Sequence, residues 1–298
     1  MDNQKIKKPK KWKKILTPYL FILPFLFTYA VFFAYPAIYS FLLSFFRYKG
    51  YGKMTFVGFN NYLSLFKYSF FWTSLKNTVF YFAAHFIPVM LTAFLFALAM
   101  HSRLLMKVQS FFKPILFMPQ IIPTVATALV FKIMFSTNTG AINQAFGLNV
   151  KWLEEPSILK WPVVFMIIWR SIGWYMVIFM AGLTTVSDDL TDAAKIDGAG
   201  YWQTVTKITI PVMRPIFLFA FVTDAISSFK IYTEPNILLT TRGRGSAAPE
   251  AQPFMNLITN NIRGGNFGSA SAAGWLLFLI ILLISLVQLK LMRGDGTE

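Results

Sequence analysis

Few side chains in this sequence are able to perform acid–base, nucleophilic or metal chemistry. Cysteine is absent, and the two histidines, His85 and His101, have no second histidine or acid at metal-ligand spacing. A thiolate nucleophile is therefore excluded, and a zinc site is not expected. Glu154 and Glu155 are adjacent in the sequence, which is typical of a solvated pair in a loop and not of an acid/base dyad. We predict that the chain has no catalytic residues and no metal site.

Two charged residues lie inside long apolar runs, where a charge is retained for a function or for a partner. Arg170 lies nine residues after Trp161, which places it about 14 Å below the outer face at helical rise. Asp224 lies thirteen residues after Pro211, about 10 Å below the same face. The similar depth favours a mutual ion pair, or two residues that face a water-filled cavity. The alternative is that Arg170 contacts a polar or anionic solute in a translocation path.

Aromatic and hydroxyl side chains lie close to these charges on the same two runs. The aromatic residues are Trp169, Trp174, Tyr175, Phe229 and Tyr232. Such rings can stack on sugars, although most aromatic residues of membrane proteins serve packing or interface anchoring. Ser227 and Ser228 add hydroxyl groups. The two runs are the best candidates for the lining of a pathway.

The apolar runs that hold these residues have the length of membrane-spanning helices. Of the 298 residues, 56% are hydrophobic and only 13% are charged, and the mean hydropathy is +0.55. A helix needs about 20 apolar residues to cross the hydrocarbon layer, whereas β-barrel strands alternate over about ten. We therefore predict an all-α integral membrane protein. Its six spans are expected at about 15–39, 76–100, 112–135, 161–183, 212–233 and 270–291.

The basic residues indicate which side of the membrane is cytoplasmic. Seven lysines occur in residues 1–14, and such clusters remain on the cytoplasmic side. We predict a cytoplasmic basic tail over 1–14, one transmembrane domain over 15–298, and both termini inside. Outside the tail, the lysines and arginines show no excess on the predicted inner side. Lipid headgroups at the membrane flanks explain the net charge of +16 better than a nucleic acid does.

A polar stretch at 184–211 interrupts the apolar runs on the predicted cytoplasmic side. Gly198 and Gly200 would each cost about 1 kcal/mol within a continuous helix, so two short helices about a turn are expected. The first has an apolar face of Leu190, Ala193 and Ala194, and the second has one of Trp202, Val205 and Ile208. Pro211 suits the start of the next helix.

The spacing in this loop resembles the EAA signature of ABC-importer permeases. That signature reads EAA, three residues, G, nine residues, I, one residue, LP. Asp192 takes the place of the glutamate and Ile210 that of the leucine. The matching positions are Ala193, Ala194, Gly198, Ile208 and Pro211. The exchange of glutamate for aspartate keeps the charge and shortens the side chain by one methylene.

The resemblance covers nearly the whole chain and is to the maltose/glycerol-phosphate-type sugar permeases. It is found in FVGFNNYLSLF (56–66), FWTSLKNTVFY (71–81), GAINQAFGL (140–148), WRSIGWYMVIFMAGL (169–183) and NFGSASA (266–272). The segment YLFILPFLFTY (19–29) is similar to the subunit of the MalF/UgpA kind. This resemblance implies the type I ABC importer permease fold and a location in the plasma membrane of a prokaryote.

The resemblance also implies partners and a cofactor held elsewhere. In that family a second homologous permease subunit completes the pathway, two cytoplasmic ATPase subunits bind ATP and Mg, and an extracellular solute-binding protein delivers the solute. The chain itself has no GxxxxGK[ST] stretch, which fits a permease that uses a separate ATPase. The residues expected to couple to the ATPase are Asp192, Ala193, Ala194, Asp197, Gly198, Ala199, Trp202, Ile208 and Pro211.

For the solute, the resemblance favours a carbohydrate, in particular an oligosaccharide that is neutral or acidic. The pathway positions that it implies are Arg170, Trp174, Tyr175, Asp224, Ser228 and Phe229. Two other classes remain open. An ion-coupled secondary transporter would need inverted repeats and ion sites at the membrane midplane, and we find no repeat. A docking component that does not transport would use the 184–211 loop as its binding site.

Overall fold

Within residues 11–102, 107–240 and 248–292, which the computed structural model describes, four helical segments are long and apolar enough to cross a membrane. The number is six if each of two bent helix pairs is one span. The four segments are Pro18–Leu43, Ser69–His101 (α4), Trp161–Leu183 (α8) and Phe267–Met292 (α15). Helix α8 coincides with the predicted range 161–183. Residues 1–10 of the predicted basic tail lie outside the described residues.

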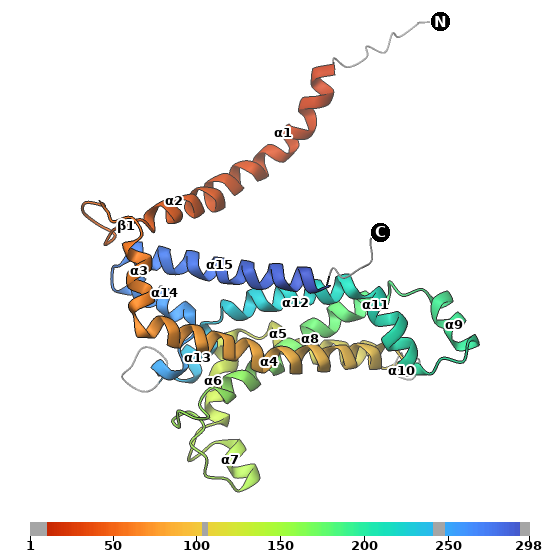
Figure 1. The fold of residues 1–298 in the computed structure, drawn as a ribbon. Coiled ribbons are helices and arrows are strands. Elements are labelled where there is room, and N and C mark those ends of the chain that lie inside the picture. Colours follow the sequence, from red (N-terminus) through yellow and green to blue (C-terminus); the bar gives the residue numbers. More distant parts are fainter. Residues whose placement is uncertain (1–10, 103–106, 241–247, 293–298) are drawn as a thin grey trace, which may run out of the picture.

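The N-terminal apolar segment diverges from the other helices (Figure 1). It consists of α1 (Lys11–Tyr29), a π-helical segment (Ala30–Ala34) and α2 (Tyr35–Leu43). Pro36 has no amide hydrogen to donate to the carbonyl four residues earlier, and a wider π turn accommodates its ring. No residue of the segment's apolar window is buried within the chain. Its apolar side chains are thus left for lipid or for another protein.

The third predicted span is a bent helix pair and not a single helix. In place of 112–135 there are α5 (Gln109–Ile121) and α6 (Thr124–Met134), with an angle of 92° between them. Pro123 lies at the break and cannot continue the hydrogen-bond ladder. The fifth predicted span, 212–233, agrees with the single helix α12 (Arg214–Phe229), and the helical segment Tyr201–Val212 that precedes it meets α12 at an angle of 70°.

Short elements gather at the two opposite ends of the bundle (Figure 1). One end holds α9 (Asp188–Ile196), α10 (Tyr201–Thr204), a second π segment (Val205–Thr209) and α11 (Ile210–Val212). The other end holds β1 (Phe46–Arg47), β2 (Thr55–Phe56), α3 (Asn60–Lys67), α7 (Ala141–Phe146), α13 (Thr233–Leu238), a 3₁₀ turn (Pro249–Ala251) and α14 (Phe254–Arg263). The two strands are antiparallel, with Phe46 opposite Phe56.

Polar side chains of α4 bind the irregular segment that precedes α14. Asn77 Nδ2 donates to the carbonyl of Gln252 at 3.0 Å, and the Tyr81 hydroxyl donates to the carbonyl of Ala251 at 2.9 Å. Thr78 Oγ1 accepts from the amide of Phe254 at 2.7 Å. Buried backbone groups outside regular helices need such partners. These bonds fix the start of α14 against α4.

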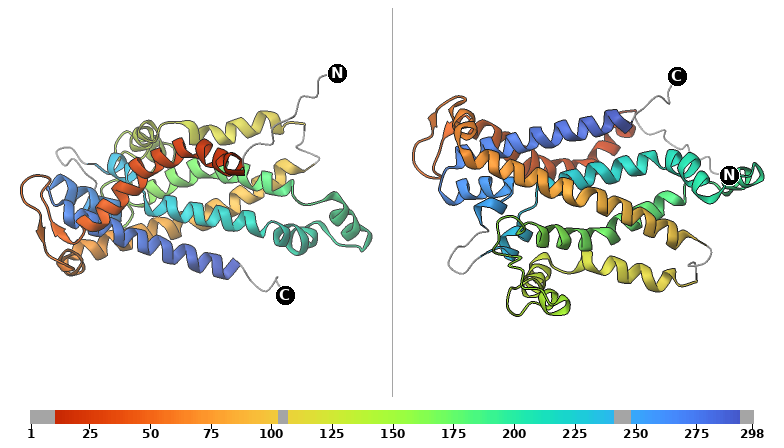
Figure 2. Two further views of the ribbon diagram at one scale, coloured as in Figure 1. Left: turned by 90° about the horizontal axis from the view of Figure 1, so that it is seen from above. Right: turned by 60° about the horizontal axis from the view of Figure 1, so that its bottom comes forward.

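Helix α5 packs closely against α8 because Gly173 has no side chain. A Cβ atom at this position would lie 1.9 Å from the carbonyl oxygen of Leu116. Figure 2 shows α5 running alongside α8. Small residues allow membrane helices to approach at backbone distance. The close contact places Gln120 of α5 and Trp174 of α8 on the wall of the same cavity.

Candidate functional site

A cavity of about 500 Å³ opens between α8, α12 and α13 and reaches α4. This volume lies in the range of small-molecule sites in proteins. Five of the six residues predicted for a solute pathway line it, namely Arg170, Trp174, Tyr175, Asp224 and Ser228. The sixth, Phe229, does not line this cavity, because its side chain is buried and packs on Phe82.

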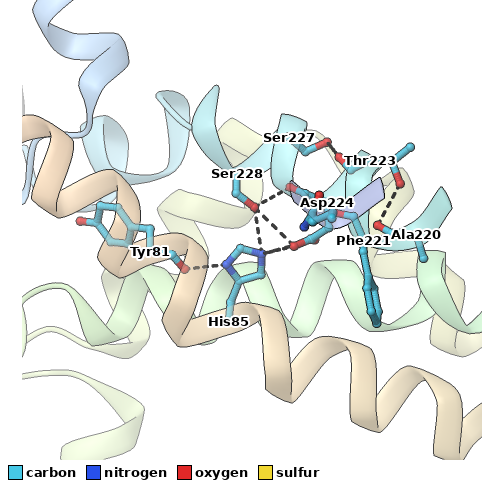
Figure 3. Close-up of polar contacts among 9 residues, drawn as sticks. Tyr81, His85, Ala220, Phe221, Thr223, Asp224, Ser227 and Ser228 are labelled. Atoms are coloured by element: carbon cyan, nitrogen blue, oxygen red, sulfur yellow. Dashed lines mark hydrogen bonds and ion pairs between the residues drawn. The ribbon is translucent and has the colours of Figure 1, made fainter. Parts of the chain in front are cut away.

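Asp224 of α12 contacts His85 of α4 in the wall of this cavity (Figure 3). The His85 Nε2 atom lies 3.2 Å from Asp224 Oδ2 and 3.3 Å from Oδ1. Ser228 Oγ lies 3.2 Å from the same nitrogen and donates to the Asp224 carbonyl at 2.6 Å. All three side chains are buried, with His85 and Asp224 each 2% exposed.

The two ring nitrogens of His85 have different partners. His85 Nδ1 is 2.6 Å from the carbonyl oxygen of Tyr81, and a carbonyl only accepts, so Nδ1 is the donor of this contact. Nε2 faces the carboxylate of Asp224 and the hydroxyl of Ser228. The contacts on both sides of the ring fix its orientation in the wall of the cavity.

Arg170 pairs with Glu234 at the outer part of the cavity. Arg170 Nη1 donates to Glu234 Oε1 at 3.4 Å, and the two side chains are 13% and 18% exposed. The predicted ion pair between Arg170 and Asp224 is therefore wrong, because each residue has a different partner. The alternative, that both face one cavity, agrees with the structure. The Nε atom of Arg170 is buried and has no hydrogen-bond partner among the described residues.

Sequence reasoning missed the roles of His85 and Glu234. No acid lies near His85 in the sequence, and its partner Asp224 is 139 residues away. Glu234 lies just beyond the predicted fifth span, and α13 folds it back over the cavity. One signal was available. Asp224 and His85 are both polar residues within apolar runs, and such residues usually pair.

The predicted two-helix loop is present at the opposite end of the bundle. Helix α9 begins after Ser187, whose Oγ accepts from the amide of Leu190 at 3.3 Å. The negative charges of Asp188 and Asp189 in the first turn interact favourably with the helix dipole and stabilise α9. Gly198 has a φ of +80°, a conformation that side chains disfavour. The chain therefore turns there into α10, as the two glycines predicted.

Buried side chains anchor the loop, and several of its apolar side chains are exposed. Ala194 and Val205 are buried, and Val205 belongs to the same apolar cluster as Phe179 of α8. By contrast, Ile196 is 86% exposed and Trp202 is 61% exposed. Exposed apolar side chains on a polar loop are typical of a protein contact surface.

The structure distributes the nine predicted coupling residues over this loop. Asp192, Ala193 and Ala194 lie on α9; Asp197, Gly198 and Ala199 form the turn; Trp202 lies on α10, Ile208 in the π segment and Pro211 in α11. Asp192 Oδ1 accepts from Lys195 Nζ at 2.6 Å on the exposed surface. A surface pair of this kind contributes little to stability, so the acid is kept accessible to a partner at little cost.

Comparison with known proteins gives a consistent result along the chain. The family model described as "Binding-protein-dependent transport system inner membrane component" matches residues 93–293. The chain is 30% identical over 290 residues to the probable ABC transporter permease protein YurN of Bacillus subtilis (strain 168), covering 95% of this chain and 98% of YurN. It is 30% identical over 277 residues to the lactose transport system permease protein LacF of Rhizobium radiobacter, with 91% of each covered.

Two solved structures of a bacterial ABC transporter that imports alginate resemble this chain. The TM-scores are 0.82 and 0.81 at 22% identity, covering 97% of this chain and 100% of the matched chain. One of them holds that transporter in complex with a periplasmic protein that binds an alginate pentasaccharide. At this identity the likeness shows the fold.

Proposed function

Since the chain belongs to the family of binding-protein-dependent transport system inner membrane components, we propose that it forms half of the translocation pathway of an ATP-driven carbohydrate importer. The second half is a homologous permease subunit. Two ATPase subunits hold ATP and Mg on the cytoplasmic side, and this chain does not hydrolyse ATP. A solute-binding protein delivers the carbohydrate from outside to the plasma membrane of a prokaryote, with both termini of this chain in the cytoplasm.

The loop of α9 and α10 is the element that docks on the ATPase. The observation that supports this role most directly is its exposed apolar surface at one end of the bundle, with Ile196 and Trp202 uncovered. Val205 joins the loop to the apolar cluster of α4, α8 and α12. A movement of the ATPase that displaces the loop is therefore transmitted to the helices that enclose the cavity. Rigid packed elements transmit such displacements.

The cavity between α8, α12 and α13 is the part of the pathway that this chain contributes. It combines hydroxyl, carboxylate and guanidinium groups with the rings of Trp174 and Tyr175. Such a mixture can hydrogen-bond to the hydroxyl groups of a sugar and stack on its ring face. LacF is named for lactose transport, which supports an oligosaccharide as the solute.

A secondary transporter is the second candidate, and the buried His85–Asp224 pair is the observation in its favour. Proton-coupled transporters use acid and histidine residues within the membrane. This candidate predicts uptake by the purified chain alone, driven by a pH gradient. The importer predicts no uptake without ATP and the other subunits.

The proposal is tested on the complex purified with its neighbouring subunits. The variant Tyr201→Asp adds a charge to the exposed surface of α10. We expect it to reduce both ATPase retention and ATP-driven uptake at least tenfold. For the binding of the ATPase, a tenfold loss of affinity is about 1.4 kcal/mol of binding free energy. The matched control is Tyr51→Asp, which is also exposed and lies at the other end of the bundle. Full ATPase retention in Tyr201→Asp, or equal loss in both variants, would contradict docking through this loop.

A further inference from the structure

Four of the ionisable groups that line the cavity form two pairs within this chain. Among the described residues, the ionisable lining groups other than tyrosine are His85, Arg170, Asp224, Lys230 and Glu234. His85 and Asp224 form the first pair, with 3.2 Å between Nε2 and Oδ2. Arg170 and Glu234 form the second pair. Only Lys230 is left, and it is exposed at the C-terminal end of α12.

Glu234 is held in place by the segment on which it lies. Lys132 Nζ of α6 donates to the carbonyls of Thr240 at 2.6 Å and of Ile237 at 3.3 Å. Ile237 belongs to the last turn of α13, where a cation binds favourably, and Thr240 lies two residues beyond the end of the helix. Asn236 Nδ2 also donates to the carbonyl of Tyr232 at 2.7 Å. The backbone on either side of Glu234 is therefore fixed, and its carboxylate stays beside Arg170 and the cavity.

The pairing changes what Arg170 can do for a solute. An unpaired arginine in an apolar cavity would bind a carboxylate by a charge-assisted, bidentate bond. Here Glu234 already takes that place, and an incoming carboxylate would meet a fixed negative charge. The carboxylate of the solute and that of Glu234 would then both lie beside Arg170. Two negative charges that close together repel strongly when water is excluded. A sugar hydroxyl has no net charge and therefore meets no such repulsion.

We infer that this half of the pathway selects uncharged saccharides, and that Glu234 is the residue that excludes acidic ones. The inference rests on the proposed carbohydrate pathway and narrows its solute class. It argues against the anionic solute that the sequence position of Arg170 had suggested as an alternative. It also separates this chain from the alginate importer that it resembles, since that likeness lies in the fold and alginate is an acidic polysaccharide.

The test measures direct binding of two probes of equal length to the assembled complex in nanodiscs. The probes are maltotriose, which is neutral, and trigalacturonate, which bears three carboxylates. Binding is followed by saturation-transfer NMR without the solute-binding protein, which would otherwise select the solute first. In the unchanged complex we expect trigalacturonate to bind at least about tenfold more weakly than maltotriose.

Two substitutions and a matched control assign this discrimination to Glu234. Glu234→Gln keeps the shape and frees Arg170, so the difference between the probes should shrink to less than about threefold or reverse. Arg170→Gln leaves the carboxylate unpaired, so the difference should grow. Glu155→Gln removes the same charge from an exposed loop outside the cavity and should leave the ratio unchanged.

The outcomes separate the solute class from the pathway itself. Equal binding of both probes, preference for trigalacturonate, or an unchanged ratio in Glu234→Gln would overturn the inference while leaving a carbohydrate pathway in place. If neither probe binds any variant at millimolar concentration, both the inference and the proposed carbohydrate pathway fail. ATPase docking through α9 and α10 is measured separately and does not depend on this result.

Discussion

At the scale of single residues, the contact between His85 and Asp224 is the polar contact whose loss should most disturb the bundle. Both side chains are 2% exposed, so a residue that loses its partner cannot turn to water. We expect His85→Ala and Asp224→Ala each to destabilise the chain by about 3 kcal/mol. The double variant should lose less than the sum, because the two residues form one unit. Thermal unfolding in detergent measures these differences.

A hydroxyl close to this pair provides the control. Ser227 Oγ donates to the carbonyl of Thr223 in an exposed bond within α12, and Ser227→Ala should change stability by less than about 0.5 kcal/mol. Strictly additive losses in the double variant would show that His85 and Asp224 do not act as a pair.

Sequence reasoning at the residue scale found the correct positions and the wrong partners. The depth of Arg170 and Asp224 follows from helical rise, and both residues do line one cavity. Depth along an axis says nothing about the direction in which a side chain points, and α12 turns Asp224 toward α4. Glu234 reaches Arg170 only because α13 folds back, and a short helix outside the spans has no hydrophobic period to reveal it.

At the scale of elements, the turn between α9 and α10 depends on Gly198. Its φ of +80° would cost about 1–2 kcal/mol for a residue with a side chain, and a change of backbone angle would redirect α9. We expect Gly198→Ala to reduce solute-stimulated ATP hydrolysis by the complex severalfold. Gly200→Ala is the matched control, since Gly200 has a φ of −70° that alanine adopts easily. Equal activity of the two variants would show that this turn does not set the docking geometry.

The contact of α5 with α8 is equally sensitive to one methyl group. Gly173→Ala would place a Cβ atom 1.9 Å from the Leu116 carbonyl, so the helices must separate. Overpacking of this kind costs about 1–3 kcal/mol, and the melting temperature in detergent should fall. Gly274→Ala in α15 has open space around it and should be neutral or slightly stabilising. An unchanged melting temperature for Gly173→Ala would mean that α5 moves freely relative to α8.

Among the elements, the straight helices were predictable and the bends were not. The predicted range 161–183 agrees with α8. A long apolar run without internal proline forms one continuous helix in a membrane, because its backbone groups must hydrogen-bond to one another. Prolines lie close to both breaks and both π segments, at Pro36, Pro123, Pro211 and Pro215. Other prolines, such as Pro88, lie inside a continuous helix. A proline alone therefore does not show whether a helix bends, and packing against α8 and α4 decides it.

At the scale of the whole molecule, the remaining question is which end faces the cytoplasm. The basic tail predicted the orientation, and residues 1–10 of it lie outside the described residues. The structure provides a second means of determining the orientation, because the loop of α9 and α10 lies at one end of the bundle and the β1–β2 hairpin lies at the other (Figure 1). The two ends must lie on opposite sides of a membrane that the long helices cross.

Cysteine labelling can determine this orientation, since the chain has no cysteine of its own. Tyr51→Cys lies in the hairpin and Ala193→Cys lies on α9, and both positions are exposed. A charged maleimide does not cross the hydrocarbon layer, so in intact cells it should label Tyr51→Cys alone. After permeabilisation it should label both, and the cysteine-free chain should stay unlabelled. Labelling of Ala193→Cys in intact cells would place the loop outside, where an ATPase that needs cytoplasmic ATP could not reach it.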